Sequence, residues 1–339
     1  MSEPTLICIF GAGSIGCYVG GRLAATGTTV CFIGREQLAK EIEAHGLHLT
    51  DYRGADLRVE AKDVDYRTNP QALADAALIL VTVKAGNTAE AAETLAKFAS
   101  PEATIVSFQN GIRNEETLRA ALPGRTVLAG MVPFNVVRLP GATFRQATEG
   151  ALDIERHAAL EPFLTAFERA GLPLKQHAEF RPVQWGKLLL NLNNAINGLS
   201  GLPLREQLSQ RAYRQCLALA QSEALRVMKV AGIKPARLTP LPPHWVPHLL
   251  ALPDRLFLLV AGRMLSVDPS ARSSMIDALD AGRATDVDWL NGEIVRLAAR
   301  VGLAAPVNAR LVELIHTAER GGQRRWSGPE LLERLRSPA

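Results

Sequence analysis

The sequence contains few aromatic residues, few cysteines and little net charge. Aromatic residues make up 5% of the 339 positions, and the formal net charge is +4. Nucleic-acid recognition uses a basic stripe with interleaved aromatic residues, so this composition argues against it. The cysteines show no C-x-x-C pair and no metal-ligand spacing, which predicts small core residues, a reducing compartment and no metal site; they are Cys8, Cys17, Cys31 and Cys216.

Long uninterrupted apolar runs are also absent. The most apolar late stretch, LLALPDRLFLLVAGRML at 249–265, is interrupted by Pro253, Asp254, Arg255 and Arg263, which predicts that it does not span a membrane. The opening residues MSEPTLICIF carry no basic region or cleavage site, so we expect no signal peptide. The expected location is the cytoplasm, without membrane or nucleic-acid partners, and the sequence leaves a homodimer open.

Apolar runs alternate with helical patterns in the first third of the chain. Helices are expected at 14–25, 88–98 and 115–122, the first stopped by Gly27 and the last capped by Asn114. Continuous apolar runs predict buried strands between them: TLICIF, TVCFIG, ALILVTVK and ATIVSFQNG. Alternating strands and helices predict an α/β fold with a Rossmann-type, doubly wound parallel sheet.

The predicted secondary structure changes twice after the first third of the chain. Short strands with Gly and Pro are expected from about 125 to 180, and the chain reads as almost entirely helical from 181 onward. We therefore expect a Rossmann-type domain at 1–180 and an all-helical domain at 181–339. The Pro-rich stretch 235–253 is expected to be a loop or a set of broken turns.

GAGSIG at 11–16 follows the first predicted strand and opens the first predicted helix. That context is what a dinucleotide-binding GxGxxG motif requires, although a glycine-rich turn without a ligand is the alternative. The glycines would give a tight turn, close approach to a pyrophosphate and close helix packing, and the helix N-terminus would face the phosphates. The expected cofactor-binding residues here are Gly11, Ala12, Gly13, Ser14, Ile15 and Gly16.

Arg35 stands where NAD-binding sites usually carry an acidic residue, at the end of the second strand and directly after Gly34. A guanidinium can pair with the 2′-phosphate of NADP in a bidentate manner, so we predict NADP. Two alternatives stay open. In the first, Glu36 is the ribose-binding acid, if the strand ends later than expected; in the second, Arg35 is simply a solvated charge at the end of a strand.

Two polar residues close later strands, Lys84 in ALILVTVK and Asn110 in FQNG. Ligands bind at the carboxyl ends of the strands in open α/β sheets, which favours a site at these positions. Each alone has an ordinary explanation, since a terminal lysine often snorkels and Asn-Gly is a common turn.

The stretch QWGKLLLNLNNAINGLSG at 184–201 is the most informative one in the second half. At about 100° per residue, Lys187, Asn191, Asn194 and Gly198 share one side of a helix, opposite an apolar side that includes Trp185. An ordinary solvated face would carry better helix formers than Asn and Gly, so the pattern favours a binding face.

The order GAGSIG, VTVKAGN, FQNG, WGKLLLN, SSM and TDVDWLNG resembles the ketopantoate reductase (2-dehydropantoate 2-reductase) family, from about residue 6 to 315. The resemblance implies a Rossmann domain followed by a helical domain, and NADPH-dependent reduction of ketopantoate to pantoate in pantothenate synthesis. It assigns catalysis to Lys187, a place between nicotinamide and substrate to Asn110, a cofactor contact to Lys84, and substrate binding to Asn191 and Ser274. A helix cap is the alternative for Ser273 and Ser274.

Three departures from the family affect the substrate side. The second helix Asn of the family falls on Ala195 here, with Asn194 beside it as a substitute in substrate binding. The late Glu of the family is Asp286, which we assign to the cofactor site; its alternative role is a favourable charge in the first turn of a helix. The Pro-rich stretch 235–253 is longer than the corresponding stretch in compact members of the family. A paralogous reductase of another oxo acid, and a cofactor-binding sensor without catalysis, are therefore the competing readings.

Overall fold

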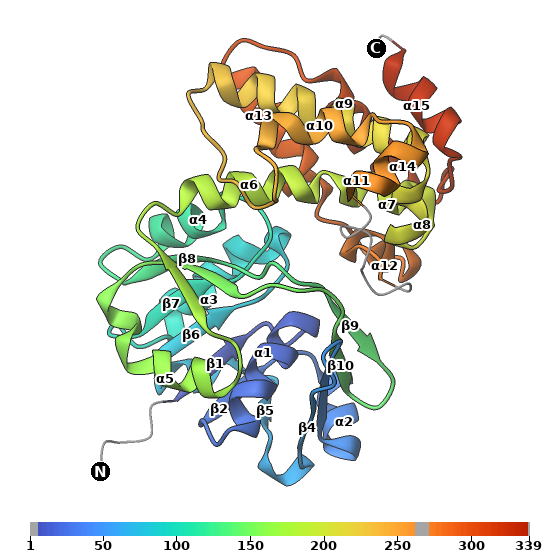
Figure 1. Ribbon diagram of the computed structural model, residues 1–339. Coiled ribbons are helices and arrows are strands. Elements are labelled where there is room, and N and C mark those ends of the chain that lie inside the picture. The colour runs from blue at the N-terminus through green and yellow to red at the C-terminus, as the bar shows by residue number, and fades with distance from the viewer. Residues whose placement is uncertain (1–5, 262–270, 338–339) are drawn as a thin grey trace. The chain divides into compact units, whose positions relative to one another are not determined.

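The computed structural model describes residues 6–261 and 271–337 (Figure 1). The chain divides into two compact units, unit 1 at Met1–Phe180 and unit 2 at Arg181–Ala339. Arg263 and its neighbours in the late apolar stretch lie outside the described residues.

Unit 1 is built on an eight-stranded sheet in the order β12-β11-β8-β7-β6-β1-β2-β5. The six strands from β5 to β8 run parallel, and β11 is antiparallel to β8. The chain starts at β1, moves outward to β2 and β5, and returns to the other side of β1 at β6, which is the doubly wound arrangement expected from the sequence. The strands are β1 Ile7–Phe10, β2 Val30–Ile33, β5 Asp65–Arg67, β6 Leu78–Val81, β7 Thr104–Ser107, β8 Val127–Met131, β11 Leu152–Glu155 and β12 Leu174–His177.

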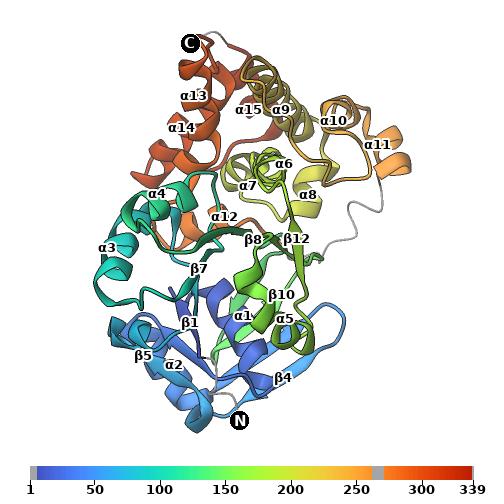
Figure 2. The same cartoon turned by 90° about the vertical axis from the view of Figure 1, so that its left-hand side faces the viewer.

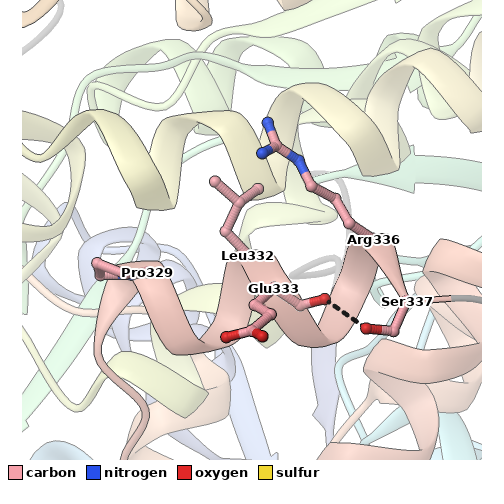
Figure 3. A pocket seen from close by; sticks show the side chains of 5 residues that line it. All are labelled: Pro329, Leu332, Glu333, Arg336 and Ser337. Atoms are coloured by element: carbon pink, nitrogen blue, oxygen red, sulfur yellow. Dashed lines mark hydrogen bonds between the residues drawn. The ribbon is translucent and has the colours of Figure 1, made fainter.

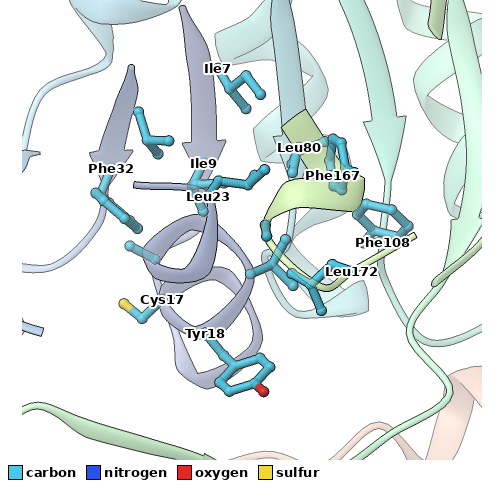
Figure 4. Packing of buried hydrophobic residues seen from close by; sticks show 14 of the residues in the cluster. Ile7, Ile9, Cys17, Tyr18, Leu23, Phe32, Leu80, Phe108, Phe167 and Leu172 are labelled. Carbon is cyan, nitrogen blue, oxygen red and sulfur yellow. The ribbon is translucent and has the colours of Figure 1, made fainter. Parts of the chain in front are cut away.

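Helices cover both faces of this sheet, as Figure 2 shows for unit 1. One face packs against α1 (Ser14–Ala25) and α5 (Glu161–Arg169), through a core that includes Ile9, Phe32, Leu80 and Phe167 (Figure 4). The other face packs against α3 (Thr88–Phe98) and α4 (Asn114–Ala121). Burial on both faces explains why the parallel strands are continuous apolar runs in the sequence.

A second, four-stranded sheet in unit 1 has the order β4-β3-β10-β9. We predicted only short strands for part of it, and nothing for residues 37–76. Its strands are β3 Leu47–Asp51, β4 Asp56–Val59, β9 Val136–Leu139 and β10 Thr143–Gln146. The other helical segments in the described part of unit 1 are α2 Glu36–His45, η1 Ala61–Asp63, η2 Pro70–Ala74, η3 Ala85–Asn87 and η4 Ala158–Leu160.

All secondary-structure elements in the described part of unit 2 are helices, which confirms the helical prediction. The 20-residue helix α9 packs against α10, α13, α14 and α15. The helices are α6 Arg181–Asn191, α7 Asn193–Ser200, α8 Leu204–Ser209, α9 Arg211–Val230, η5 Pro243–Trp245, α10 Val246–Leu250, α11 Asp254–Ala261, α12 Ser274–Asp280, η7 Val287–Trp289, α13 Asn291–Arg300, α14 Pro306–Glu319 and α15 Gly328–Arg336.

The Pro-rich segment 235–253 is more ordered than predicted. Residues up to Pro242 are irregular, but η5 and α10 follow, each with a proline in its first turn, where no intrahelical N–H bond is lost. The buried guanidinium of Arg214 holds the end of the segment by donating to Leu250 O at 3.2 Å and Leu252 O at 2.8 Å. The part of the segment that forms α10 therefore packs into the helical core of unit 2, against α9.

No helix within residues 6–261 and 271–337 is long and apolar enough to cross a bilayer. The four cysteines are buried free thiols, as expected. Burial raises the pKa of Cys216 to about 12, so this thiol stays protonated and unreactive at neutral pH.

Candidate active site

The carboxyl ends of the central strands of unit 1 meet at one edge of the sheet. Phe10 is paired with both Ile33 and Val81, and Val81 with Ser107. The loops that follow these four residues therefore emerge side by side. They contain the glycine motif, Arg35, Lys84 and Asn110, so the topology brings together the cofactor residues predicted for unit 1.

The glycine motif has the geometry that its glycines were expected to provide. Gly11 adopts φ +105°, and a Cβ there would lie 2.5 Å from the amide nitrogen of Val83. The Gly11 and Ala12 amides donate to Ile33 O at 3.0 and 2.9 Å. A Cβ at Gly16 would lie 2.6 Å from Oγ1 of Thr82. The turn is thus locked between the ends of β2 and β6.

Gly13 differs from the other two glycines, because the space around it is open. A Cβ there would meet nothing closer than Gly11 O at 3.9 Å. Gly13 is the N-cap of α1, no side chain caps the helix, and its first turn carries no acidic residue. The helix therefore presents uncompensated N–H groups and a positive dipole end beside open space, which suits the pyrophosphate of a dinucleotide.

Arg35 lies just after the end of strand β2, as the sequence predicted. Strand β2 ends at Ile33, Gly34 follows, and the exposed Arg35 is the N-cap of α2. Glu36 is the first residue of α2 and pairs with Lys40 at 3.0 Å. The strand does not extend to Glu36, which weakens the alternative that Glu36 binds the ribose.

Sequence reasoning missed Tyr66, the middle residue of strand β5. Its hydroxyl donates to Arg35 O at 3.2 Å, and any Cβ on Gly34 would collide with it. Burial raises the pKa of Tyr66, so this phenol remains a neutral donor. Gly34 is thus required by a neighbouring side chain. Nothing near residue 66 in the sequence indicated this contact, because no strand was predicted there.

Lys84 and Asn110 lie in the turns after β6 and β7. Lys84 is exposed and is the N-cap of η3, and Asn110 is half-buried. The prediction that Asn114 caps α4 is wrong: Arg113 is the N-cap, and Asn114 is the first helical residue. Its side-chain amide instead donates to Asn110 O at 2.6 Å. The polar side chain thus serves the Asn110 turn and not the helix end.

The helix predicted over 184–201 is two helices that meet at Leu192, α6 and α7. Lys187 and Asn194 are half-buried, and Asn191 is 8% exposed. Gly198 does not belong to an open face, because it packs under Leu279 and Ile315. The predicted polar face therefore ends at Asn194.

Two other asparagines of this stretch have structural roles. Asn193 Oδ1 accepts from Gln207 Nε2 at 2.8 Å, and the fully buried Asn197 donates to Leu202 O at 2.8 Å. Asn197 Oδ1 also accepts from the Ser273 amide at 2.9 Å. These bonds join α7 to the start of α12, where Ser274 lies.

The two neighbouring serines at the start of α12 divide the predicted roles between them. Ser273 is the N-cap, its Oγ accepting from the Ile276 amide at 3.4 Å. Ser273 Oγ also donates to Asn194 O at 3.5 Å. Ser274 is the exposed first residue of the helix. The capping alternative thus applies to Ser273 and leaves the Ser274 hydroxyl available for a ligand close to Asn194.

The alternative role of Asp286 required a place in the first turn of an α-helix, and the structure does not put it there. It precedes the single 3₁₀ turn η7, and α13 begins only at Asn291. The loop is fastened to α14 from both sides of Asp286: Glu319 accepts from the Thr285 amide at 2.7 Å, and Asp288 contacts His316 Nε2 at 3.1 Å. His316 also contacts Glu319 at 2.8 Å. This clamp was not predicted.

No cluster of metal-ligating side chains occurs within the described ranges. A surface depression on α15 is lined by Pro329, Leu332, Glu333, Arg336 and Ser337 (Figure 3). It contains none of the predicted site residues and is formed by one helix end, where Ser337 Oγ donates to Glu333 O at 3.0 Å. It plays no part in the candidate site.

Comparison with known proteins agrees with this architecture. Residues 7–159 match the family described as "Ketopantoate reductase PanE/ApbA", and residues 179–319 match its C-terminal domain. The 2-dehydropantoate 2-reductase of Halobacterium salinarum is 28% identical over 329 residues, covering 93% of this chain and 99% of that protein. The same enzyme of Pyrococcus horikoshii is 28% identical over 320 residues, covering 92% and 97%.

Solved structures extend the comparison. A PanE/ApbA family ketopantoate reductase from Ralstonia eutropha JMP134 superposes with a TM-score of 0.79 at 29% identity, covering 94% of this chain and 100% of that one. D-mandelate dehydrogenase, solved with NADH and anilino(oxo)acetate, has a TM-score of 0.76 at 19% identity, covering 94% and 99%, and shares the fold. On the two family matches, which span nearly the whole chain, this protein belongs to the ketopantoate reductase family of oxidoreductases.

Proposed function

We propose that the chain catalyses NADPH-dependent reduction of a 2-oxo acid to a 2-hydroxy acid, with 2-dehydropantoate as the substrate and pantoate as the product. Unit 1 is the NADP-binding domain, and unit 2 is the helical substrate and catalytic domain. The observation that carries the proposal is the turn at Gly13, where an uncapped helix start faces open space in a family of oxidoreductases.

The residues of unit 1 suit NADPH. The amides at the start of α1 would hold the pyrophosphate, and Arg35 would pair with the 2′-phosphate in a bidentate manner. Lys84 comes from the turn after β6, at the switch point between β1 and β6, and Asn110 comes from the turn after the neighbouring strand β7. The nicotinamide end of a dinucleotide would lie at this switch point. When bound, the nicotinamide supplies the hydride.

The residues of unit 2 would supply the proton and hold the acid. As hydride reaches the carbonyl carbon of the substrate, negative charge develops on the carbonyl oxygen, and Lys187 donates a proton to it. Asn191 and Asn194 would orient the substrate, and Ser274 would bind its carboxylate. The sum is one 2-oxo acid, one NADPH and one proton converted to one 2-hydroxy acid and NADP⁺.

The identity of the acid is the finer part of the proposal. Ala195 departs from the family pattern on the helix assigned to substrate binding, which favours testing a second oxo acid alongside 2-dehydropantoate. The decisive experiment follows NADPH oxidation with a panel of 2-oxo acids that differ in the bulk of the side chain. Turnover of 2-dehydropantoate with the highest kcat/KM supports the proposal. A higher kcat/KM for another oxo acid would reassign the substrate, and no turnover of any of them would reject the reductase.

A further inference from the structure

Four polar side chains lie buried between the turns that carry Lys84 and Asn110. They are Ser107, Gln109, Thr88 and Asn114, each between 3% and 8% exposed, and are called the turn network below. A buried polar group costs free energy unless its hydrogen bonds are made. Apolar residues of similar volume would fill this space without that constraint, so a specific role for the network is worth seeking.

Hydrogen bonds connect the turn network into one unit. Ser107 Oγ donates to Gln109 Oε1 at 3.0 Å, and Gln109 Nε2 donates to Thr88 Oγ1 at 2.9 Å. The single proton of the Thr88 hydroxyl is shared between two acceptors, Asn114 Oδ1 at 3.0 Å and Ala85 O at 2.7 Å. The Thr88 hydroxyl is therefore the link between the strand β7 side of the network and helix α4.

The network reaches the two turns through main-chain carbonyls. Gln109 Nε2 donates to Val83 O at 3.1 Å, and the Thr88 hydroxyl is 2.7 Å from Ala85 O. These two carbonyls belong to the residues on either side of Lys84. Asn114 Nδ2 donates to Asn110 O at 2.6 Å. One connected set of bonds thus fixes the backbone on both sides of Lys84 and at Asn110 itself.

We propose that Thr88, Gln109 and Asn114 are positioning residues, which hold Lys84 and Asn110 in one geometry relative to each other. The inference rests on the proposed function, in which Lys84 contacts the cofactor and Asn110 lies between the nicotinamide and the substrate. Displacement of a positioned group by about 1 Å can lower a rate by about 10²-fold, so fixing the two turns to one another matters for turnover.

A pair of substitutions at Thr88 separates positioning from packing. Thr88→Val keeps the shape and removes the hydroxyl, leaving Gln109 and Asn114 without their shared partner, whereas Thr88→Ser keeps the hydroxyl. We expect Thr88→Val to lower kcat/KM by about tenfold or more, with raised Kd for NADPH. Thr88→Ser should stay within about threefold of the unsubstituted protein, the scale of a small packing change.

A matched control lies at the other end of the same helix. The guanidinium of Arg125 donates to Leu95 O and Ala99 O, both at 3.0 Å, and so fastens the C-terminal end of α3 as Thr88 fastens the N-terminal end. Arg125→Met should lower Tm and leave the kinetic constants of the folded protein unchanged. Equal kinetic losses in Arg125→Met and Thr88→Val would overturn the proposal, as would unchanged constants in a folded Thr88→Val.

A second variant covers the case in which Thr88→Val does not fold. Asn114→Asp keeps the side-chain shape but replaces the donor to Asn110 O with a carboxylate oxygen, which repels it. The same loss of kcat/KM is expected, and unchanged kinetics in this variant would overturn the proposal. The Kd for NADPH, measured by nucleotide fluorescence, needs no turnover. If the unsubstituted protein reduced no oxo acid but bound NADPH, the function proposed above would fail, and this Kd would still test the positioning.

Discussion

The predicted residues of unit 1 are largely backbone positions, whereas those of unit 2 are side chains on helices. At Gly11, Gly13 and Gly16, the local geometry leaves no place for a Cβ or leaves open space beside a helix start. At Lys187, Asn191 and Asn194, the backbone is ordinary helix, and the proposed chemistry would depend on the side chains alone.

This difference explains why the sequence predicts the cofactor residues of unit 1 more directly than the side-chain roles in unit 2. A backbone that needs φ +105° or a close helix contact admits glycine and little else, so the motif reports the geometry directly. An asparagine on a helix can instead bind a ligand or satisfy a buried neighbour. Asn191 and Asn197 illustrate this: both are buried, and the bonds of Asn197 are structural.

The largest expected effect falls on unit 2. Lys187→Ala should lower kcat by about 10²-fold or more, the usual worth of an acid catalyst, and leave the Kd for NADPH nearly unchanged. Lys229→Ala, at an exposed position in the last turn of α9, is the matched control and should leave kcat unchanged. A near-normal kcat in Lys187→Ala would remove the lysine from the chemistry and make Asp286 the next proton donor to test.

A smaller and cofactor-specific effect is expected in unit 1. Arg35→Ala should weaken NADPH binding by roughly 1–3 kcal/mol, about 5- to 150-fold in Kd, because a charged hydrogen-bonded contact to the 2′-phosphate is lost. NADH lacks this phosphate, so its Kd should hardly change. Titration of both cofactors measures the difference. An equal loss for both would show that Arg35 does not read the phosphate.

A helical glycine beside Lys187 tests the packing of unit 2. A Cβ at Gly186 would lie 2.6 Å from Ala236 O, and the Ala236 amide donates to Pro182 O at 2.7 Å, so the start of the Pro-rich segment is pinned against α6. Backbone cannot move aside cheaply, and Gly186→Ala should lower the free energy of unfolding by about 1–3 kcal/mol.

Gly292 in α13 is the matched control for Gly186. A Cβ there would meet its nearest neighbour, Val287 O, at an ordinary 3.5 Å. Because alanine favours helix over glycine by up to about 1 kcal/mol, Gly292→Ala should be neutral or stabilising. Urea unfolding of both variants checks the contrast, and similar stabilities would mean that the segment yields to α6 easily.

Periodicity and turn chemistry predicted the sheet, the helices at 14–25 and 88–98, and the change to helical structure near 181. They failed where tertiary contacts decide. Asparagine is a common N-cap residue, but the side-chain amide of Asn114 donates to the carbonyl oxygen of Asn110 instead. The break at Leu192 leaves helical spacing almost intact and so gives no sequence signal. The second sheet pairs β3 with β10, which lies far away in the sequence. Neither segment alone carries a signal that predicts this pairing.

The smallest effect concerns the clamp of His316 on the loop that carries Asp286. Partial burial lowers the pKa of His316, but hydrogen bonds to Glu319 and Asp288 outweigh it, and the net pKa is raised above the usual 6.5. Burial likewise opposes the shift of Glu319, but its bonds to His316 and Thr285 lower its pKa below the usual 4.5. His316 therefore stabilises the fold fully below pH 6.5, and this is lost as pH rises through its raised pKa. The contribution of Glu319 is complete above pH 4.5 and is lost as pH falls through its lowered pKa.

His316→Gln should expose this dependence. Between pH 4.5 and 6.5 both partners are charged, and the substitution should cost about 0.5–1 kcal/mol, since the partly exposed pairs are screened by solvent. At about pH 9, where an ordinary histidine is neutral, the cost should shrink toward that of a neutral hydrogen bond or less. Urea unfolding of both proteins across this range measures the difference. A cost that did not change with pH would mean that His316 holds the loop as a neutral ring, and the charge of the clamp would have no part in placing Asp286.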